Sequence, residues 1–117
     1  LIMENQNELA VLETLDSGKP ISDTIEIDTT ETAECITWYA EAEDKMEDQL
    51  TAAGSDVVSM IVRETIGVVG AILPWNFTMM MAGWKLGPSL ASCNSVVLKP
   101  SKLTTLTMLK SSTKYST

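Results

Sequence analysis

The stretch that decides the fold is VVGAILPWNFTMMMAGWKLGPSLASCNSVVLKP, residues 68–100. Its opening run, 68–73, is dense in β-branched residues and predicts a fully buried strand that Pro74 ends. Residues 78–91 show helical periodicity, and residues 95–100 are typical of another strand. Because parallel strands need a crossover between them, this order predicts the start of a parallel sheet. We therefore expect an α/β fold built on a strand-helix-strand unit.

Two helices are predicted before this unit. Residues 1–17 place apolar side chains near helical spacing, with acidic residues between them. Gly18 fits the left-handed position that ends a helix, and Pro20 prevents continuation. A second helix is expected from Asp28, because the run DTTE has the form of a capping box, to about Asp48.

The remaining segments are predicted as a loop, a strand and a short helix. AAGSD, residues 52–56, is typical of a loop, and residues 57–64 have the β-branched density of a strand. A break at 65–67 separates that strand from the next one. A further helix is expected to begin within 104–110, and the polar tail, 111–117, is expected to fray.

Charge divides the chain into two parts. The net charge is −8, but residues 1–56 hold 15 acids and two lysines, whereas residues 57–117 hold one acid and six bases. We therefore expect an acidic helical segment followed by the strand-helix-strand segment. Arg63 is the only arginine, which argues against a nucleic-acid partner. The acidity mainly favours solubility.

Cysteine and histidine usage excludes several kinds of site. Cys35 and Cys93 are too few and too isolated for a disulfide framework, and the sequence has no histidine. We expect no metal site and a reducing compartment, the cytoplasm. No secretory signal is visible at the start, where charged residues are frequent.

The run without charges between Glu64 and Lys85 is about as long as a membrane span. Glycines, Pro74 and Asn76 interrupt it, and its first half is rich in β-branched residues. This pattern favours a buried strand, a turn and a helix, so we expect no membrane partner.

The corner PWNF, residues 74–77, places a polar residue between two apolar segments. From spacing alone, Asn76 is either a functional amide or a cap for the helix at 78. In the same way, Trp75 fits the core, and Lys99 fits a solvated charge at a strand end.

Several motifs nevertheless occur together, in an order and at spacings that are more specific than any one of them. They resemble the first part of the nicotinamide-dependent aldehyde dehydrogenase superfamily over about residues 1–110, with the betaine-aldehyde and aminoaldehyde members most similar. The motifs are ETLDSGKP, WYAEAEDK, IGVVGAILPWNF, WKLGPSLA and NSVVLKPS.

The resemblance implies roles for five residues. Asn76 would donate its amide to the oxyanion that forms when a catalytic thiolate attacks an aldehyde. Ile72, Pro74 and Trp75 would line the adenosine side of an NAD(P) cleft, and Lys99 would hydrogen-bond the adenosine ribose. The implied fold is a truncated aldehyde-dehydrogenase-like segment. Its acidic helical part is 1–56, and 57–117 is the incomplete start of a Rossmann-like dinucleotide-binding domain.

The sequence also departs from the family pattern. The family's nucleophilic Cys, general-base Glu and Gly-rich phosphate turn lie beyond this segment, and neither Cys93, which stands where Gly is usual, nor Cys35 can replace the nucleophile. Lys102 stands in place of an acid that accepts ribose hydroxyls. Threonines replace prolines at three turns, and we expect them to relax those turns. They are Thr65, Thr78 and Thr105.

These features predict a fragment of an aldehyde dehydrogenase that is inactive alone. Binding of NAD(P) is expected to be weak or absent, and an aldehyde is a substrate only for a full-length relative. The alternative is a non-catalytic protein of the same ancestry that self-associates. In either case we expect a homo-oligomer, because strands near residues 57–62 have unpaired edges.

Overall fold

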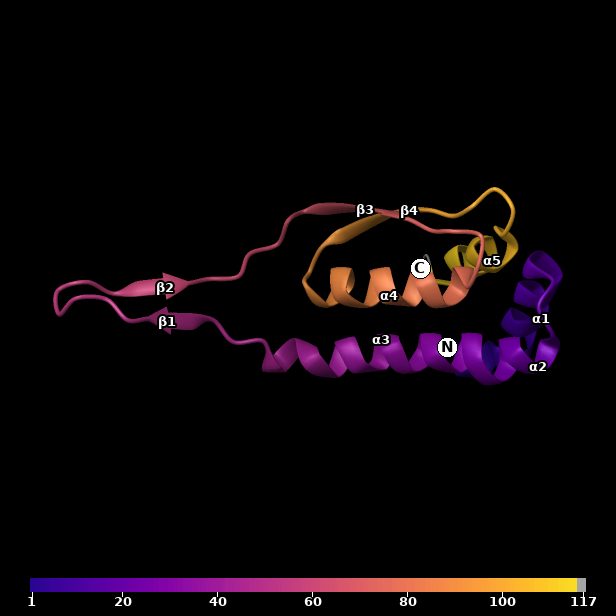
Figure 1. Ribbon diagram of the computed structural model, residues 1–117, viewed down its shortest axis with the longest axis horizontal. Helices are drawn as coiled ribbons and strands as arrows, with labels where there is room; N and C mark the ends of the chain where they lie inside the picture. The colour runs from indigo at the N-terminus through magenta and orange to yellow at the C-terminus, as the bar shows by residue number, and fades with distance from the viewer. Residues whose placement is uncertain (116–117) are drawn as a thin grey trace.

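The computed structural model describes residues 1–115, with side chains through residue 113. Four helices and a parallel strand pair form its body, from which a hairpin extends (Figure 1). The longer helices are α1 (Gln6–Ser17), α3 (Thr30–Ala42), α4 (Thr78–Ala91) and α5 (Leu106–Tyr115). Shorter helical turns are Met3–Asn5, α2 (Ile21–Asp23), the π-helical Thr24–Thr29 and Glu43–Lys45. The strands are β1 (Gln49–Thr51), β2 (Ser59–Ile61), β3 (Val68–Ile72) and β4 (Ser95–Lys99).

The predicted strand-helix-strand unit is confirmed. Strands β3 and β4 pair in parallel, from Val68 opposite Ser95 to Ile72 opposite Lys99. Helix α4 runs between them as the crossover, as a parallel pair requires. In Figure 1 it lies between the strand pair and α3, so the body has three layers.

The prediction that β3 is fully buried was wrong. Helix α4 covers one face of the strand pair, where Ala71 and Leu73 are buried. No described element covers the other face, and more than 60% of each large apolar side chain there is exposed. These side chains are Val68, Ile72 and Val97. A run of β-branched residues is typical of a strand that packs against other elements on both faces. Here the described residues cover only one face.

Two glycines let α3 and α4 approach closely. A Cβ added at Gly83 would meet Thr32 Cγ2 at 3.1 Å, and one added at Gly87 would meet Tyr39 Cδ2 at 2.7 Å. Gly83 is the nearer of the two glycines to the start of α4. At that start, α1 and α5 pack beside the helix (Figure 1). The apolar core lies there, and its buried members are Leu9, Leu73, Met79, Ala82 and Met108.

The first helix ends as predicted, but the second begins earlier than expected. Gly18 adopts a left-handed conformation, φ 74°, and its N–H bonds the Thr14 carbonyl at 2.9 Å. The chain is already helical from Ile21, so Asp28 caps nothing. Its buried carboxylate instead accepts charge-assisted hydrogen bonds from the Lys19 ammonium, at 2.7 and 3.0 Å.

The π-helical turn before α3 has a local cause. The hydroxyls of Thr29 and Thr30 both donate to the carbonyl of Ile25, at 2.8 and 3.1 Å. The Gln6 side-chain amide donates to the same oxygen at 3.0 Å. These bonds compete with the regular helical ladder, which widens there by one residue.

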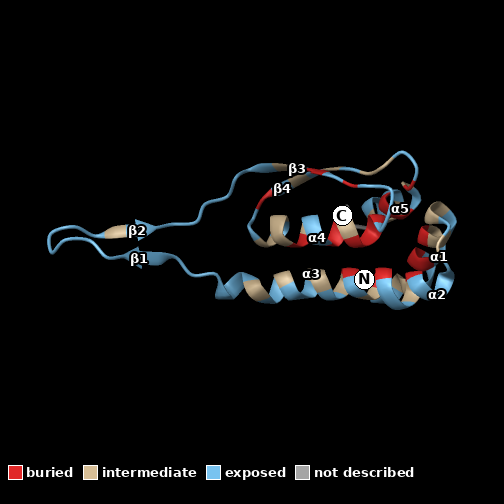
Figure 2. Ribbon diagram, in the orientation of Figure 1, coloured by how far each residue is buried: buried red, intermediate tan, exposed pale blue. Residues whose placement is uncertain are grey.

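The arm, residues 46–67, is an antiparallel hairpin of β1 and β2. The sequence predicted only the second strand, and the predicted range, 57–64, is longer than β2. No residue from 46 to 67 is buried. Figure 2 shows this arm almost entirely in the colour of exposed residues. It gives the molecule extents of 63 × 27 × 24 Å and a radius of gyration of 17.9 Å, against about 13 Å for a compact domain of this size.

The expected fraying of the tail was also wrong for the part of it that the structure describes. Helix α5 continues to Tyr115, and residues 116–117 lie outside the described part. Met108 enters the core, and Lys110 pairs with Glu8 of α1 at 2.7 Å, so tertiary contacts hold the first turns of α5, from which the helix continues into the tail. Within residues 1–115, no helix combines the length and apolarity needed to cross a bilayer.

Candidate functional site

The carboxyl end of the strand pair gathers the residues that the sequence singled out. Ile72 ends β3 opposite Lys99, which ends β4, and the Leu73 N–H donates to the Lys99 carbonyl at 2.9 Å. The corner from Pro74 to Phe77 follows at once and leads into α4. Registered neighbours share a face of a sheet, so Ile72 and Lys99 lie side by side on its open face. This edge is where parallel sheets bind ligands.

The corner is exposed, and two of the structural interpretations of its residues were wrong. Trp75 is 59% exposed and therefore not a core residue. Phe77, at φ 53°, occupies the cap position of α4, and its side chain makes no capping hydrogen bond, so Asn76 is not the cap of this helix. The Asn76 amide is exposed and makes no hydrogen bond to any described residue. Lys99 is also exposed, as a solvated charge would be.

Thr78 fastens the corner from behind. Its side chain is fully buried, and its hydroxyl lies 3.3 Å from the carbonyl oxygens of both Pro74 and Trp75. The same hydroxyl lies 2.6 Å from that of Thr104, in the loop after β4. The resemblance places a proline at position 78, whose ring would restrict the backbone. Here the Thr78 hydroxyl bridges two segments instead, so hydrogen bonds hold the corner.

Glu13 of α1 is a buried carboxylate close to the corner. Its position in the sequence predicts only one of the acidic residues on the first helix. Its Oε2 accepts the hydroxyl of Thr107 at 2.8 Å, while Oε1 is buried without a hydrogen-bond partner among the described residues. Burial raises the pKa of Glu13, and the Thr107 hydrogen bond opposes this. Leu9 and Glu13 are four residues apart and share one helix face, a signal that could have placed Glu13 inside.

A partly buried cation, Lys19, lies beside the corner. Lys19 Nζ, which binds Asp28, also lies 3.4 Å from the ring centroid of Phe77. A cation over an aromatic face is favourable, and here it contributes to holding Phe77 in a left-handed conformation that L-residues otherwise avoid.

The residues present fit one side of an NAD(P) site. Ile72, Pro74 and Trp75 offer an exposed apolar wall, and Lys99 offers a donor next to it. Lys102 is exposed as well, and its ammonium is a donor that cannot accept a hydrogen bond from a ribose hydroxyl. Among the described residues, these groups would suit the adenosine side of a dinucleotide.

Neither cysteine has the surroundings of a nucleophile. Burial raises the pKa of Cys35, which disfavours its thiolate. Cys93 is exposed and adopts a left-handed conformation, φ 56°, just after α4. The N–H groups of Cys93 and Asn94 bond back to the carbonyls of Leu90 and Ser89, a Schellman motif that usually contains glycine. Among residues 1–115, no three His, Cys, Asp or Glu side chains are grouped to hold a metal.

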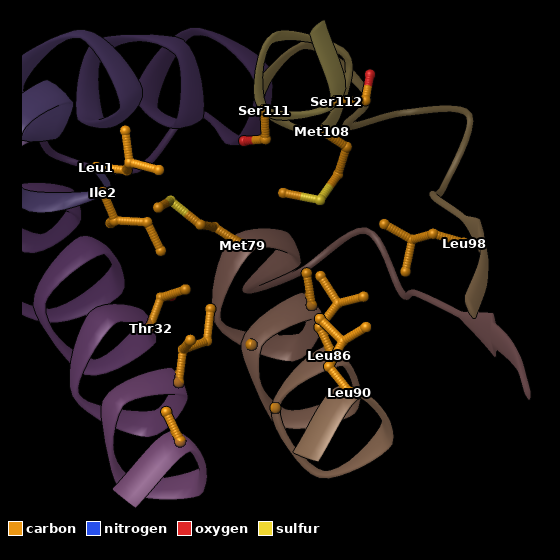
Figure 3. A pocket seen from close by; sticks show the side chains of 15 residues that line it. Leu1, Ile2, Thr32, Met79, Leu86, Leu90, Leu98, Met108, Ser111 and Ser112 are labelled. Atoms are coloured by element: carbon orange, nitrogen blue, oxygen red, sulfur yellow. The ribbon is translucent and has the colours of Figure 1, made fainter. Parts of the chain in front are cut away.

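An apolar hollow of about 550 Å³ lies between α3, α4 and β4, away from the corner (Figure 3). Leu86 and Leu90 of α4, Leu98 of β4 and Thr32 of α3 contribute to its wall. The figure shows Met79 and Met108 at its inner end, toward the core. Apolar hollows of this size mark a surface that other side chains or a ligand cover.

Comparison with known proteins identifies the family. The sequence profile described as aldehyde dehydrogenase family matches residues 1–114. The chain belongs to the aldehyde dehydrogenase family. Aminoacetaldehyde dehydrogenase of Pseudomonas aeruginosa is 50% identical over 110 residues, which are 94% of this chain and 22% of that protein. The NADP/NAD-dependent aldehyde dehydrogenase PuuC of Escherichia coli is 47% identical over the same shares of both chains.

Solved aldehyde dehydrogenases contain the same fold. The aldehyde dehydrogenase KauB from Pseudomonas aeruginosa superposes with a TM-score of 0.90 at 50% identity, over 93% of this chain and 22% of that one. PnpE, in complex with nicotinamide adenine dinucleotide, gives 0.89 at 40% identity over the same shares. The α/β aldehyde dehydrogenase segment expected from the sequence is thereby confirmed, and the chain spans 22% of the length of the curated relatives it matches.

Proposed function

We propose that this chain is the part of an NAD(P)-dependent aldehyde dehydrogenase that carries the oxyanion donor and one wall of the cofactor site. Asn76 is the donor, Ile72, Pro74 and Trp75 are the wall, and Lys99 hydrogen-bonds the adenosine ribose. The observation that supports the proposal is the register of β3 and β4, which sets Ile72 opposite Lys99 at the edge where the exposed corner begins. Bound NAD(P)⁺ would accept the hydride from the aldehyde.

The chain alone is proposed to be inactive. An oxyanion donor stabilises a charge that develops only after a nucleophile has attacked. Cys35 is partly buried with a raised pKa, and the sequence has no histidine to activate Cys93. Dinucleotide binding is proposed to be millimolar or weaker, about −4 kcal/mol, because only the adenosine side is present.

The proposal is tested by calorimetric titration with NAD⁺ and NADP⁺ and by reduced-cofactor absorbance with a panel of aldehydes. We expect no turnover and at most millimolar binding, which Lys102→Glu should tighten by restoring an acceptor. Turnover that Cys93→Ser abolishes would contradict the proposed inactivity. Micromolar binding by the unchanged chain would contradict the proposed half-site.

A second function, self-association, is favoured by the exposed arm and the open face of the strand pair. Leu50, Val58 and Ile66 of the arm are each more than three quarters exposed. Unpaired strand edges with apolar side chains recruit further strands. We propose a homo-oligomer in which the β2 region makes the main contact, and sedimentation that shows a folded monomer at high concentration would reject it.

The remaining proposals concern organisation and location. Residues 1–56 are proposed as an acidic helical segment and 57–117 as the incomplete start of a dinucleotide-binding domain, although the β1–β2 hairpin spans that division. We propose a cytoplasmic protein without nucleic-acid or membrane partners, in line with the single arginine and the net charge of −8. Fractionation of cells that express the tagged chain tests the location.

A further inference from the structure

Helix α1 lies next to the starts of two other helices and directs a carboxylate toward each. Asp16 Oδ2 accepts the N–H of Leu106, the first residue of α5, at 2.7 Å. Glu13, one turn earlier, contacts α5 through the Thr107 hydroxyl, and the backbone N–H of Met79, in the first turn of α4, stabilises its charged form. Carboxylates are favourable at helix starts, where backbone N–H groups lack partners within the helix.

The start of α4 depends on such outside groups. Its cap residue, Phe77, makes no side-chain hydrogen bond to the helix and is left-handed. The first turn therefore has backbone N–H donors that find no hydrogen-bond partner within the helix. Glu13 is fully buried in this place and keeps one oxygen, Oε1, without a hydrogen-bond partner among the described residues.

Buried hydroxyls connect the same region to the corner. Thr107 binds Glu13, and Thr104, three residues earlier, lies 2.6 Å from the Thr78 hydroxyl. Thr78 in turn lies 3.3 Å from the carbonyl oxygens of Pro74 and Trp75, which flank the approach to Asn76. All three threonines are at most 3% exposed, so water does not replace these bonds.

We propose that Glu13 is a positioning residue for the corner, and that its carboxylate, buried beside the start of α4 and bonded to the Thr107 hydroxyl, sets where Asn76 presents its amide. The importance of that amide rests on the proposed function, whereas the coupling from Glu13 to Asn76 does not. An ionised Glu13 attracts the first turn of α4, and a protonated one attracts it less, so the corner responds to the charge of a residue that touches no ligand.

The charges around Glu13 act in both directions. Asp28, in the π-helical turn, raises its pKa, and Lys19, in the loop after α1, lowers it, but burial has the largest effect and the net result is a raised pKa. On the α1–α5 side, Asp16 is engaged by Leu106 and Glu8 by Lys110. Glu13 therefore takes up its proton at a higher pH than an ordinary glutamate.

The test follows side-chain amide signals by NMR in the whole chain, labelled with ¹⁵N-asparagine, from about pH 3.5 to about pH 8. It needs neither cofactor nor aldehyde, so its failure is distinct from failure of the proposed function. The sequence contains Asn5, Asn7, Asn76 and Asn94. We expect the Asn76 signal to shift with a midpoint above 4.5, the ordinary value for glutamate, while Asn94, at the far end of α4, stays constant.

Two variants and a control complete the test. Glu13→Gln should abolish the Asn76 titration, and Thr107→Val should raise its midpoint, because the lost hydrogen bond lowers the pKa of Glu13. Glu8→Gln removes another α1 acid and should leave the curve unchanged. If Glu13→Gln fails to fold, the unchanged chain and Thr107→Val still decide. A constant Asn76 signal in the folded chain, or a titration that survives Glu13→Gln, would overturn the proposal.

Discussion

The body and the arm of this chain obey different rules. In the body, α3 and α4 pack so closely that Gly87 has no room for a Cβ, and the buried Asp28 is paired with Lys19. In the arm, Gly54 has open space around it, and the ion pair at its base, Asp44 with Lys45, is mostly solvated. The body is therefore stabilised by contacts among its own elements. In the arm, β1 and β2 pair with each other, but no described residue packs against the pair closely enough to bury it.

The largest expected effect separates the buried ion pair from the solvated one. Asp28→Asn should lower the free energy of unfolding by about 3 kcal/mol, because it leaves Lys19 half-desolvated and without its countercharge. Asp44→Asn, the matched change at the arm, should cost less than about 0.5 kcal/mol. Urea unfolding monitored by circular dichroism measures both values, and equal costs would erase the distinction between body and arm.

The next effect uses glycines in the same way. Gly87→Ala should destabilise the chain by about 1–2 kcal/mol, since the new Cβ would lie 2.7 Å from the Tyr39 ring and overpacking exceeds the gain in helix propensity. Gly54→Ala adds a Cβ in open space and should change stability by less than about 0.5 kcal/mol. A stabilised Gly87→Ala would show that α3 and α4 pack more loosely than described.

A smaller effect, of opposite sign, is expected at the end of α4. Cys93→Gly should stabilise the chain by about 1 kcal/mol, because glycine accepts the left-handed φ of 56° without the strain of a Cβ. Cys93→Ala keeps the Cβ and should give no gain, which separates the backbone effect from loss of the thiol. Thermal unfolding of the three chains makes the comparison.

The smallest effect on stability is expected in the arm, where association should change instead. Ile61→Lys places a charge on an exposed strand and should weaken self-association with little change in unfolding. Leu103→Lys adds the same charge on an exposed loop of the body and serves as the control. Sedimentation velocity over a range of concentrations measures association, and equal behaviour of both variants would exclude the arm as the contact.

The sequence predicted the parts of the fold that depend on local signals. Gly18 ends α1, Pro74 ends the β3 segment, and the bounds of α4 match the predicted 78–91. It failed where tertiary contacts decide. Asp28 pairs with Lys19 and caps no helix, and α5, held in its first turns by Met108 and Lys110, continues into the tail that was expected to fray. A capping box and a polar tail are local patterns, and tertiary contacts override them.

For the site, the resemblance singled out Asn76, Ile72 and Lys99. The parallel register sets Ile72 opposite Lys99, and Asn76 follows Ile72 by four residues. The threonines behind the corner and Glu13 were missed as site residues. Their roles depend on contacts between residues as far as 94 positions apart in the sequence. The periodicity of a single helix or strand cannot predict such contacts. Glu13 shares a helix face with Leu9, and that was the one available sign of its burial.

The most direct test of the central claim exchanges the matched segment of the Pseudomonas aeruginosa aminoacetaldehyde dehydrogenase for residues of this chain. We predict that the chimera oxidises an aminoaldehyde with NAD(P)⁺, and that Asn76→Ala in the chimera lowers kcat by about 10²–10³-fold while it stays folded. A folded, active chimera in which Asn76→Ala changes nothing would contradict the role assigned to the corner.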